Sequence, residues 1–258
     1  MQNRSLPKVS VLIPAFNEEK YILQTLEAIM QQDYPNFEVI VADNASIDRT
    51  SVIVQEFIDS LPKGCISIKL VYESRKGTNF ARECARQAST GTVIAQLDAD
   101  CVPGKSWISK GVIALCSNRR KRVAVTGPYD YYDSNIWMRR FSLLSQQLVY
   151  PGINTMVQIA GRAAILIGGN TFVRAEILES AGGYNTALTF YGDDVDMGKR
   201  ISKYGEVAYI PTLTLPTSSR RYQANGFWEV NKKYQACFWN LVWQKENLLQ
   251  TVETSHPR

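Results

Sequence analysis

Short apolar runs along the chain alternate with longer stretches in which apolar residues recur every three or four positions. The short runs predict buried strands at residues 9–13, 38–42, 66–72, 93–97 and 123–126. The longer stretches predict helices at residues 18–31, 50–59, 78–89 and 105–117. This alternation is typical of crossover units in a mainly parallel sheet, and the continuously apolar strands indicate helices on both of its faces.

The second half of the chain has a less regular pattern. It predicts an amphipathic helix at residues 136–150 that carries Trp137, Phe141, Leu144 and Leu148 on one face. A short strand at residues 171–173 and helices at residues 175–181, 193–204 and 227–249 follow, the last of them rich in aromatic side chains. Neither a repeat nor a strong linker divides the chain, so we expect one α/β domain over residues 1–258, with helices flanking a single sheet.

The composition excludes several kinds of chemistry. The single histidine, His256, removes histidine zinc sites, Ser–His–Asp triads and Cys–His dyads from consideration. The five cysteines show no metal-binding spacing, which favours reduced thiols. A membrane-spanning apolar stretch and a signal-peptide pattern are both missing, so we expect a cytoplasmic protein. Its chemistry must therefore come from carboxylates, arginines, lysines or hydroxyls.

The net charge of +5 suits anionic partners such as nucleotides, lipid head groups or nucleic acid. On the predicted helix at residues 136–150, Arg139 and Arg140 lie close to Trp137. This pattern is compatible with peripheral contact to the inner face of a membrane. Ordinary packing of the apolar face into the core explains the same pattern more simply.

The segment Asp98-Ala99-Asp100 directly follows the predicted strand at residues 93–97. In an open α/β sheet, ligands bind at the carboxyl ends of the strands. Residues two apart on an extended chain point to the same side, so Asp98 and Asp100 can face one ligand. Two carboxylates with room for water suit a hard divalent cation that also holds phosphates. A loop that is acidic by chance is the alternative.

Other predicted strands also end in polar residues. Asp43 ends the second strand, where its carboxylate can accept hydrogen bonds from a base or ribose or can form a turn. Asp48 or Ser46 is better placed to cap the next helix, with Asp48 favoured. Lys76 and Arg82 flank the exit of the third strand and are candidates for phosphate contact, although Arg82 can equally be a solvated helix residue.

A second acidic group, Asp193, Asp194 and Asp196, lies at the start of the predicted helix at residues 193–204. One aspartate would suffice to cap the helix, and three repel one another unless something positive faces them. A carboxylate here can serve as general base for a hydroxyl. The helix dipole is expected to lower its pKa and so to make it a weaker base.

Four segments in this order resemble family 2 glycosyltransferases, which have the GT-A fold. Residues 9–19 resemble the opening of the family, and residues 39–48 its second strand and acidic turn. Residues 98–100 resemble its DxD motif, and residues 182–196 its acceptor-side segment. The fingerprints G-x-G-x-x-G and G-x-x-x-x-G-K-[ST] are missing, which disfavours dinucleotide dehydrogenases and P-loop enzymes.

The resemblance implies a role for each matched residue. Asp43 would contact the base, Asp98 the ribose or the metal, and Asp100 a Mg²⁺ or Mn²⁺ ion that bridges the diphosphate. Asp194 would be the catalytic base. The remaining positions implied by the resemblance are Pro14, Ala15, Asn17, Glu18, Lys76, Arg82 and Ala99 on the donor side, Gly169, Asn170 and Asp193 on the acceptor side, and Arg220 and Arg221 at the phosphates. A surface position is the alternative for both of these arginines.

The resemblance also implies the activity. The chain would be an inverting, metal-dependent transferase that moves a sugar from a nucleoside-diphosphate sugar, by default a UDP-sugar, to a hydroxyl of a glycan, lipid-linked or small-molecule acceptor. Residues 5–128 would bind the nucleotide sugar, residues 129–220 the acceptor, and residues 221–258 would form a helical extension. The QxxRW motif of processive synthases is missing, so repeated addition is not expected. The alternatives are a nucleotide-sugar-binding protein without catalysis and, least supported, a nucleic-acid binder.

Overall fold

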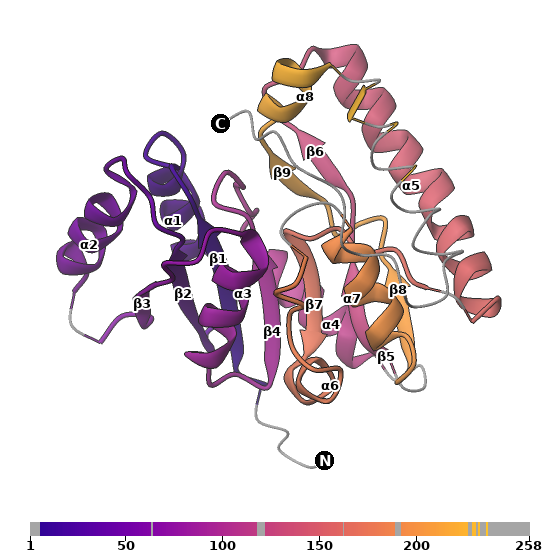
Figure 1. Ribbon diagram of the computed structural model, residues 1–258, viewed down its shortest axis with the longest axis horizontal. Helices are drawn as coiled ribbons and strands as arrows, with labels where there is room; N and C mark the ends of the chain where they lie inside the picture. Colours follow the sequence, from indigo (N-terminus) through magenta and orange to yellow (C-terminus); the bar gives the residue numbers. More distant parts are fainter. Residues whose placement is uncertain are drawn as a thin grey trace.

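A seven-stranded sheet runs through the molecule in the order β3-β2-β1-β4-β7-β5-β8 (Figure 1). The structure is a computed structural model that describes residues 6–62, 64–117, 122–161, 163–188, 192–226, 229, 230, 232 and 236. The strands are β1 (Val9–Ala15), β2 (Phe37–Asp43), β3 (Ile68–Tyr72), β4 (Val93–Leu97), β5 (Arg122–Thr126), β7 (Asn170–Arg174) and β8 (Glu206–Tyr209). All pairings are parallel except those of β7 with β4 and β5. The predicted α/β architecture with a mainly parallel sheet is confirmed.

Helices cover both faces of this sheet. On one face, α1 (Ile22–Met30), α2 (Thr50–Ser60) and α4 (Trp107–Cys116) pack in one apolar cluster with strand residues such as Val11 and Phe172. On the other face, α3 (Thr78–Gln87), α6 (Ala175–Ser180) and α7 (Asp193–Ile201) pack with residues such as Leu12 and Val173. Neighbouring residues along a strand therefore enter different layers, which explains why the strands are apolar throughout.

The strand register brings several loops to one edge of the sheet. Ala15 at the end of β1 is paired with Asp43 at the end of β2, and β4 runs parallel to β1 on its other side. Because β7 is antiparallel, its first residue, Asn170, is paired with Leu97 at the end of β4. The loop before β7 therefore lies beside the loop after β4, at the carboxyl edge of the parallel strands.

A second, smaller sheet was not predicted from the sequence. It consists of the parallel strands β6 (Tyr129–Tyr131) and β9 (Leu215–Thr217), followed by the short helix α8 (Arg220–Asn225). The small sheet lies beyond the carboxyl edge of the large one (Figure 1). The expectation of a single sheet is therefore wrong, because strands of three residues carry almost no periodic signal.

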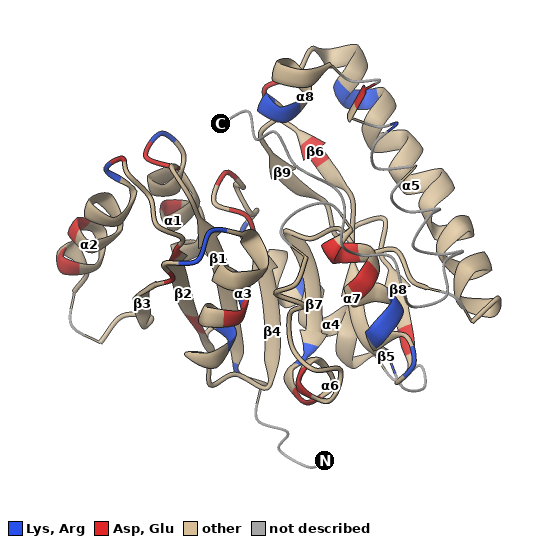
Figure 2. Cartoon of the chain, in the orientation of Figure 1, with Lys and Arg blue, Asp and Glu red and all other residues tan. Residues whose placement is uncertain are grey.

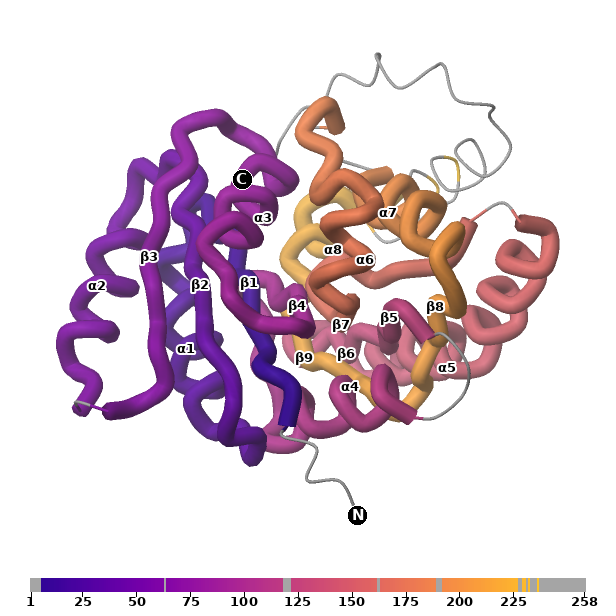
Figure 3. Tube along the Cα trace, turned by 90° about the horizontal axis from the view of Figure 1, so that it is seen from below, coloured from indigo at the N-terminus to yellow at the C-terminus, as the bar shows by residue number. Residues whose placement is uncertain are grey.

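The helix α5 (Ile136–Ile159) lies along the outer flank and packs against β6 and β8 (Figure 3). It starts where Asn135 accepts a hydrogen bond from the backbone N–H of Met138, and it extends past the predicted end through Pro151. The predicted helix at residues 227–249 lies outside the described residues, apart from Glu229, Val230, Lys232 and Ala236. In the described parts of the chain, no helix is both long and apolar enough to cross a bilayer.

Candidate functional site

The loops after β1 and β2 form one wall of the candidate site. The backbone N–H of Asn44 donates to the carbonyl of Ala15 at 2.8 Å, and that of Glu18 donates to Thr50 Oγ1 at 2.7 Å. Asn17 has a positive φ of 55°, which asparagine tolerates better than most residues. These cross-links hold the predicted donor-side residues in a fixed loop.

Asp43 lies buried in this wall, and its Oδ1 atom is without a hydrogen-bond partner among the described residues. A buried acceptor without a partner is costly, so this oxygen is suited to a donor group on a ligand. Lys76 is exposed, and its ammonium lies 5.2 Å from the ring centre of Phe16, the residue after β1. Asp48 accepts from the N–H of Thr50 at 3.0 Å, but the N-cap residue of α2 is Arg49, so the expected N-cap position of Asp48 is wrong by one residue.

Asp98 lies where β4, the loop before β7 and the small sheet meet. Its Oδ2 atom accepts a hydrogen bond from the Tyr129 hydroxyl at 2.9 Å, and that hydroxyl accepts from the Gly169 N–H at 2.8 Å. A Cβ atom added to Gly169 would lie 2.4 Å from the Asp98 carboxylate, so the glycine is required for this approach. Tyr129 was not predicted, because only the pairing of β6 with β9 brings it to this place.

Arg82 connects the two acidic groups. Its guanidinium lies 2.7 Å from Asp193, 3.3 Å from Asp98 and 3.7 Å from Asp194, and its side chain is 6% exposed. Burial alone would lower the pKa of Arg82, but these carboxylates outweigh it and raise the pKa above its usual range. The alternative of a solvated helix residue is therefore wrong. Contact of Arg82 with a phosphate stays a prediction.

Asp194 lies at the start of α7, where it accepts a hydrogen bond from the Gly168 N–H at 3.1 Å. Burial raises the pKa of Asp194, the charge of Asp193 raises it further, and Arg82 offsets part of the effect. The expectation that the helix dipole would lower this pKa is wrong, because burial and a like charge dominate. The N-cap position of α7 is Gly192 rather than one of the aspartates. A carboxylate with a raised pKa suits a general base.

Asp100 and Glu18 share one arginine from the far end of the chain. Arg220 on α8 lies 3.1 Å from Asp100 Oδ2 and 2.7 Å from Glu18 Oε2, and it stacks over the ring of Tyr21. Burial raises the pKa of Asp100 to about 6, although Arg220 opposes this effect. Arg220 is therefore part of the site and not a free surface residue. Arg221 follows it in the first turn of α8.

Three further predicted positions lie within the fold around the site. The Asn170 side chain is fully buried, accepts from the indole N–H of Trp107 at 2.8 Å and donates to the carbonyl of Leu213 at 2.7 Å. Its polar atoms are thus bonded within the fold, and its place on the acceptor side stays a prediction. Ala99 is buried as well, and its carbonyl accepts from Thr25. Pro14, paired with Ala42, lies one residue before the end of β1.

The charges of the site lie around the carboxyl edge of the large sheet, as Figure 2 shows for the acidic start of α7 and the basic start of α8. Within the described residues, no three His, Cys, Asp or Glu side chains converge on a metal position. Asp98 and Asp100 alone suit Mg²⁺ or Mn²⁺, since such ions take one or two carboxylates and complete their shell with water and phosphate. The side chains of Asp98 and Asp100 are 36% and 12% exposed, so both can take part in holding a divalent cation at this edge.

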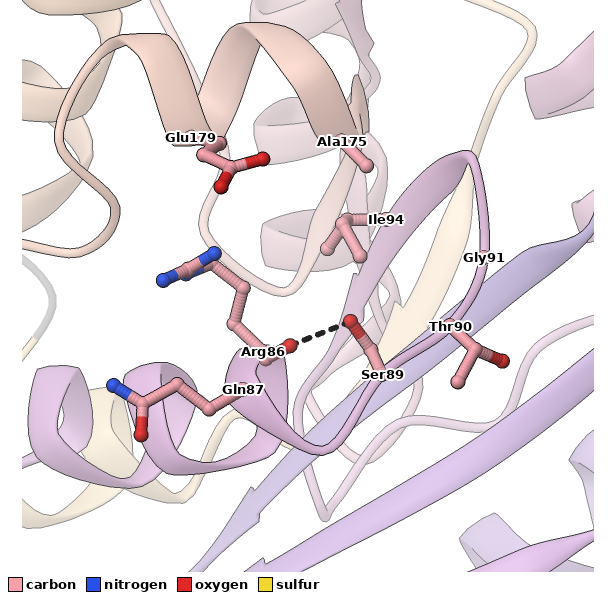
Figure 4. Close-up of a pocket in the computed structure, with 8 residues that line it drawn as sticks. All are labelled: Arg86, Gln87, Ser89, Thr90, Gly91, Ile94, Ala175 and Glu179. Carbon is pink, nitrogen blue, oxygen red and sulfur yellow. Dashed lines mark hydrogen bonds between the residues drawn. The ribbon is translucent and has the colours of Figure 1, made fainter.

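Two cavities lie away from this edge. One of about 370 Å³ lies at the amino end of β4 and is lined by residues that include Arg86, Ser89 and Glu179 (Figure 4). Arg86 is paired with Glu83 there. The other, of about 340 Å³, lies between α5 and β8. Neither cavity contains the predicted site residues.

Comparison with known proteins places this arrangement in a family. The profile described as glycosyl transferase family 2 matches residues 10–182. The chain belongs to glycosyl transferase family 2. This chain is 29% identical over 203 residues to glycosyltransferase AglE of Haloferax volcanii. The alignment covers 78% of this chain and 63% of AglE.

Two further proteins are similar to this chain. This chain is 31% identical over 144 residues to the UDP-Glc:α-D-GlcNAc-diphosphoundecaprenol β-1,3-glucosyltransferase WfgD of Escherichia coli. The alignment covers 55% of this chain and 53% of WfgD. Among solved structures, this chain is similar to the mannosyltransferase PcManGT of Pyrobaculum calidifontis in complex with GDP-Man and Mn²⁺. That likeness has a TM-score of 0.67 at 24% identity and covers 89% of this chain and 61% of PcManGT. The fold is thus the GT-A fold, and this chain spans less than two thirds of each relative.

Proposed function

We propose that this chain transfers one sugar at a time from a nucleoside-diphosphate sugar to an acceptor hydroxyl, with inversion at the anomeric carbon. The observation that carries the proposal is the division of the carboxylates at the sheet edge. Asp98 and Asp100 follow β4, whereas Asp194 lies on α7 beyond the Gly168–Gly169 loop. In this proposal, the donor and the acceptor would each be served by a different carboxylate group of the same site.

The donor side supplies binding and charge balance. The unpartnered Oδ1 of Asp43 would accept from the base, while Lys76 and Arg221 would contact the diphosphate. Asp98 and Asp100 would hold a divalent cation, which when bound neutralises charge on the departing diphosphate. Arg220, now paired with Asp100 and Glu18, is placed to turn toward the phosphates.

The acceptor side supplies the base. Asp194 would take the proton of the acceptor hydroxyl as its oxygen forms the new bond to the anomeric carbon. The bond from that carbon to the diphosphate oxygen breaks, and its electron pair leaves with the nucleoside diphosphate. The Gly168 N–H and Arg82 fix the orientation of the base.

The names of the relatives bear on donor and acceptor. PcManGT was solved with GDP-Man and WfgD is named for UDP-Glc, so we keep UDP as the default base and treat GDP as the first alternative. WfgD is named for a diphosphoundecaprenol-linked acceptor, which makes a lipid-linked glycan the first acceptor class to test. We propose residues 5–128 as the donor half and residues 129–220 as the acceptor half. A cytoplasmic location stays a prediction.

A two-stage experiment tests the proposal. A thermal-shift screen of nucleotide sugars with Mn²⁺ identifies the donor, because a ligand that binds the native state raises its melting temperature. Release of the nucleoside diphosphate then measures turnover in the wild type, in Asp194→Asn and in the control Asp59→Asn, which changes an exposed aspartate on α2.

We expect Asp194→Asn to lose about 10²–10⁴-fold in turnover while its donor-induced thermal shift is retained. The control should keep the activity of the wild type. Donor binding without any turnover by the wild type would favour the alternative, a nucleotide-sugar-binding protein. Full turnover by Asp194→Asn would overturn the assignment of the base.

A further inference from the structure

Helix α5 turns a mainly polar side to the protein, with one buried apolar residue, Val157, in a small cluster with Ala163. Ser142, Gln146 and Asn154 are among its buried residues. The Gln146 side chain accepts from the backbone N–H of Tyr129 at 3.0 Å and donates to the carbonyl of the same residue at 3.1 Å. The Asn154 side chain donates to the carbonyl of Val207 at 2.9 Å. Side-chain hydrogen bonds to backbone groups therefore attach much of this helix to the fold.

The opposite side of α5 is apolar and exposed. A surface helix of a globular protein ordinarily has the reverse arrangement, with the apolar stripe against the core. Six residues form what we call the α5 stripe, with exposed fractions of 79%, 63%, 54%, 76%, 71% and 82% for Trp137, Phe141, Leu144, Leu148, Met156 and Ile159. Their spacing follows one face of the helix over a length of about 33 Å. Core packing, the simpler explanation from the sequence, is wrong for this face.

The charges of α5 indicate what can cover the stripe. The helix contains neither Asp nor Glu, and its only charged residues are Arg139 and Arg140 near the N-terminus, as Figure 2 shows. Arg139 is paired with Asp130 of β6, whereas Arg140 is exposed close to Trp137. A second copy packed stripe to stripe would offer no carboxylate from its own α5 to Arg140. An anionic lipid surface offers both a negative charge and an apolar layer.

We propose that the α5 stripe is a docking surface for an anionic lipid bilayer, with the helix lying parallel to the membrane plane. An amphipathic helix with an aromatic and aliphatic face and basic residues binds in this way. Docking would also orient the candidate site. Tyr129, which binds Asp98, and Tyr131, which contacts Tyr222 of α8, belong to the strand that leads into α5. The small sheet at the edge of the site would then lie close to the bilayer surface.

Vesicle co-sedimentation tests this proposal directly. The full chain is mixed with vesicles of equal parts phosphatidylglycerol and phosphatidylcholine, and with vesicles of phosphatidylcholine alone. The test variants are Phe141→Ser with Leu148→Ser, and Arg140→Glu. The matched controls are Ile47→Ser and Ile113→Ser, which remove apolar side chains that are 87% and 68% exposed elsewhere.

We expect binding to the anionic vesicles that falls about tenfold or more in the double variant and in Arg140→Glu, and remains unchanged in both controls. Binding to phosphatidylcholine alone should be weaker, and added salt should weaken binding to the anionic vesicles. Because the substituted side chains are exposed, the melting temperature of each variant should match that of the wild type.

Several results would overturn the proposal. Failure of the wild type to sediment with anionic vesicles does so outright. So does equal loss of binding in the double variant and in Ile113→Ser, because the stripe would then have no special part. Light scattering could instead show a dimer that does not bind vesicles. If Phe141→Ser with Leu148→Ser dissociated that dimer, the stripe would be assigned to a contact between two copies. Sugar transfer to a water-soluble acceptor is measured separately, so failure of docking and failure of the proposed function are distinguishable.

Discussion

Gly168 leaves the space that the carboxylate of Asp194 occupies. A Cβ atom added to this glycine would lie 2.5 Å from Asp194 Oδ1 and 2.8 Å from Arg82 Nη2. The backbone at Gly168 is not in the left-handed region, so alanine is compatible with its conformation. We therefore expect Gly168→Ala to act through its methyl group alone, by displacing Asp194 from its hydrogen bond with the Gly168 N–H.

The size of the effect follows from this geometry. Ordinary contact to a Cβ begins at 3.4 Å, so Asp194 Oδ1 must move by about 0.9 Å, the difference between 3.4 and 2.5 Å. A misplacement of about 1 Å in a reacting group costs on the order of 10²-fold in rate. Stability should change little, by about 1 kcal/mol or less, because the end of a flexible side chain moves and no backbone is displaced.

The assay is the release of nucleoside diphosphate at saturating donor and acceptor, together with the donor-induced thermal shift. Gly104→Ala is the matched control, since its added Cβ would meet nothing within 4 Å among the described residues. We expect about a 10²-fold lower kcat for Gly168→Ala with its donor-induced shift retained, and wild-type behaviour for the control. A kcat for Gly168→Ala within about threefold of the wild type would refute the reasoning that the position of Asp194 limits turnover.

Three more predictions concern stability and metal. Burial would raise the pKa of Glu38, but hydrogen bonds from Ser10, Thr90 and Lys69 outweigh it and hold the pKa at about 2 instead of 4.5. The unfolded state therefore binds more protons than the folded state between pH 4.5 and pH 2. Over this range the free energy of unfolding of the wild type, measured with urea, should fall by about 3 kcal/mol relative to that of Glu38→Gln. Parallel pH dependences of the two proteins would contradict this. Gly111→Ala, whose Cβ would lie 2.4 Å from the Phe172 ring, should destabilise by about 1–3 kcal/mol in thermal unfolding, and a higher melting temperature would show that α4 adapts. Chelation of Mn²⁺ should abolish most of the donor-induced thermal shift, and an unchanged shift would argue against a metal-bridged diphosphate.

Local pattern was sufficient for every strand of the large sheet except β8. The strands of the first half are short apolar runs with polar residues at their ends, so Asp43 and Asp98 could be placed at a ligand-binding edge. Local pattern was insufficient for β6, β8, β9 and α8, which have three to six residues each. Such short elements form because partners are available in the fold, and pairing leaves little trace in a single segment.

Helix α5 shows a second kind of limit. The 3.6-residue periodicity correctly indicated one apolar face at Trp137, Phe141, Leu144 and Leu148. Periodicity states that such a face exists but not whether it points inward, because that depends on what the rest of the chain offers to each side. Here the backbone groups of Tyr129 and Val207 form hydrogen bonds with side chains on the polar side of α5, and the apolar side faces outward.

The amino-acid sequence by itself determined the α/β architecture, the family and the acidic residues at the ends of β2 and β4, because these depend on residues that are neighbours along the chain. Only the tertiary structure decided how they work together. The antiparallel placement of β7 brings Gly168 and Gly169 against Asp194 and Asp98. Arg220 reaches Glu18 across 202 positions of sequence. Burial at this meeting point, rather than the local helix dipole, raises the pKa of Asp194, because desolvation depends on everything that surrounds a group in space.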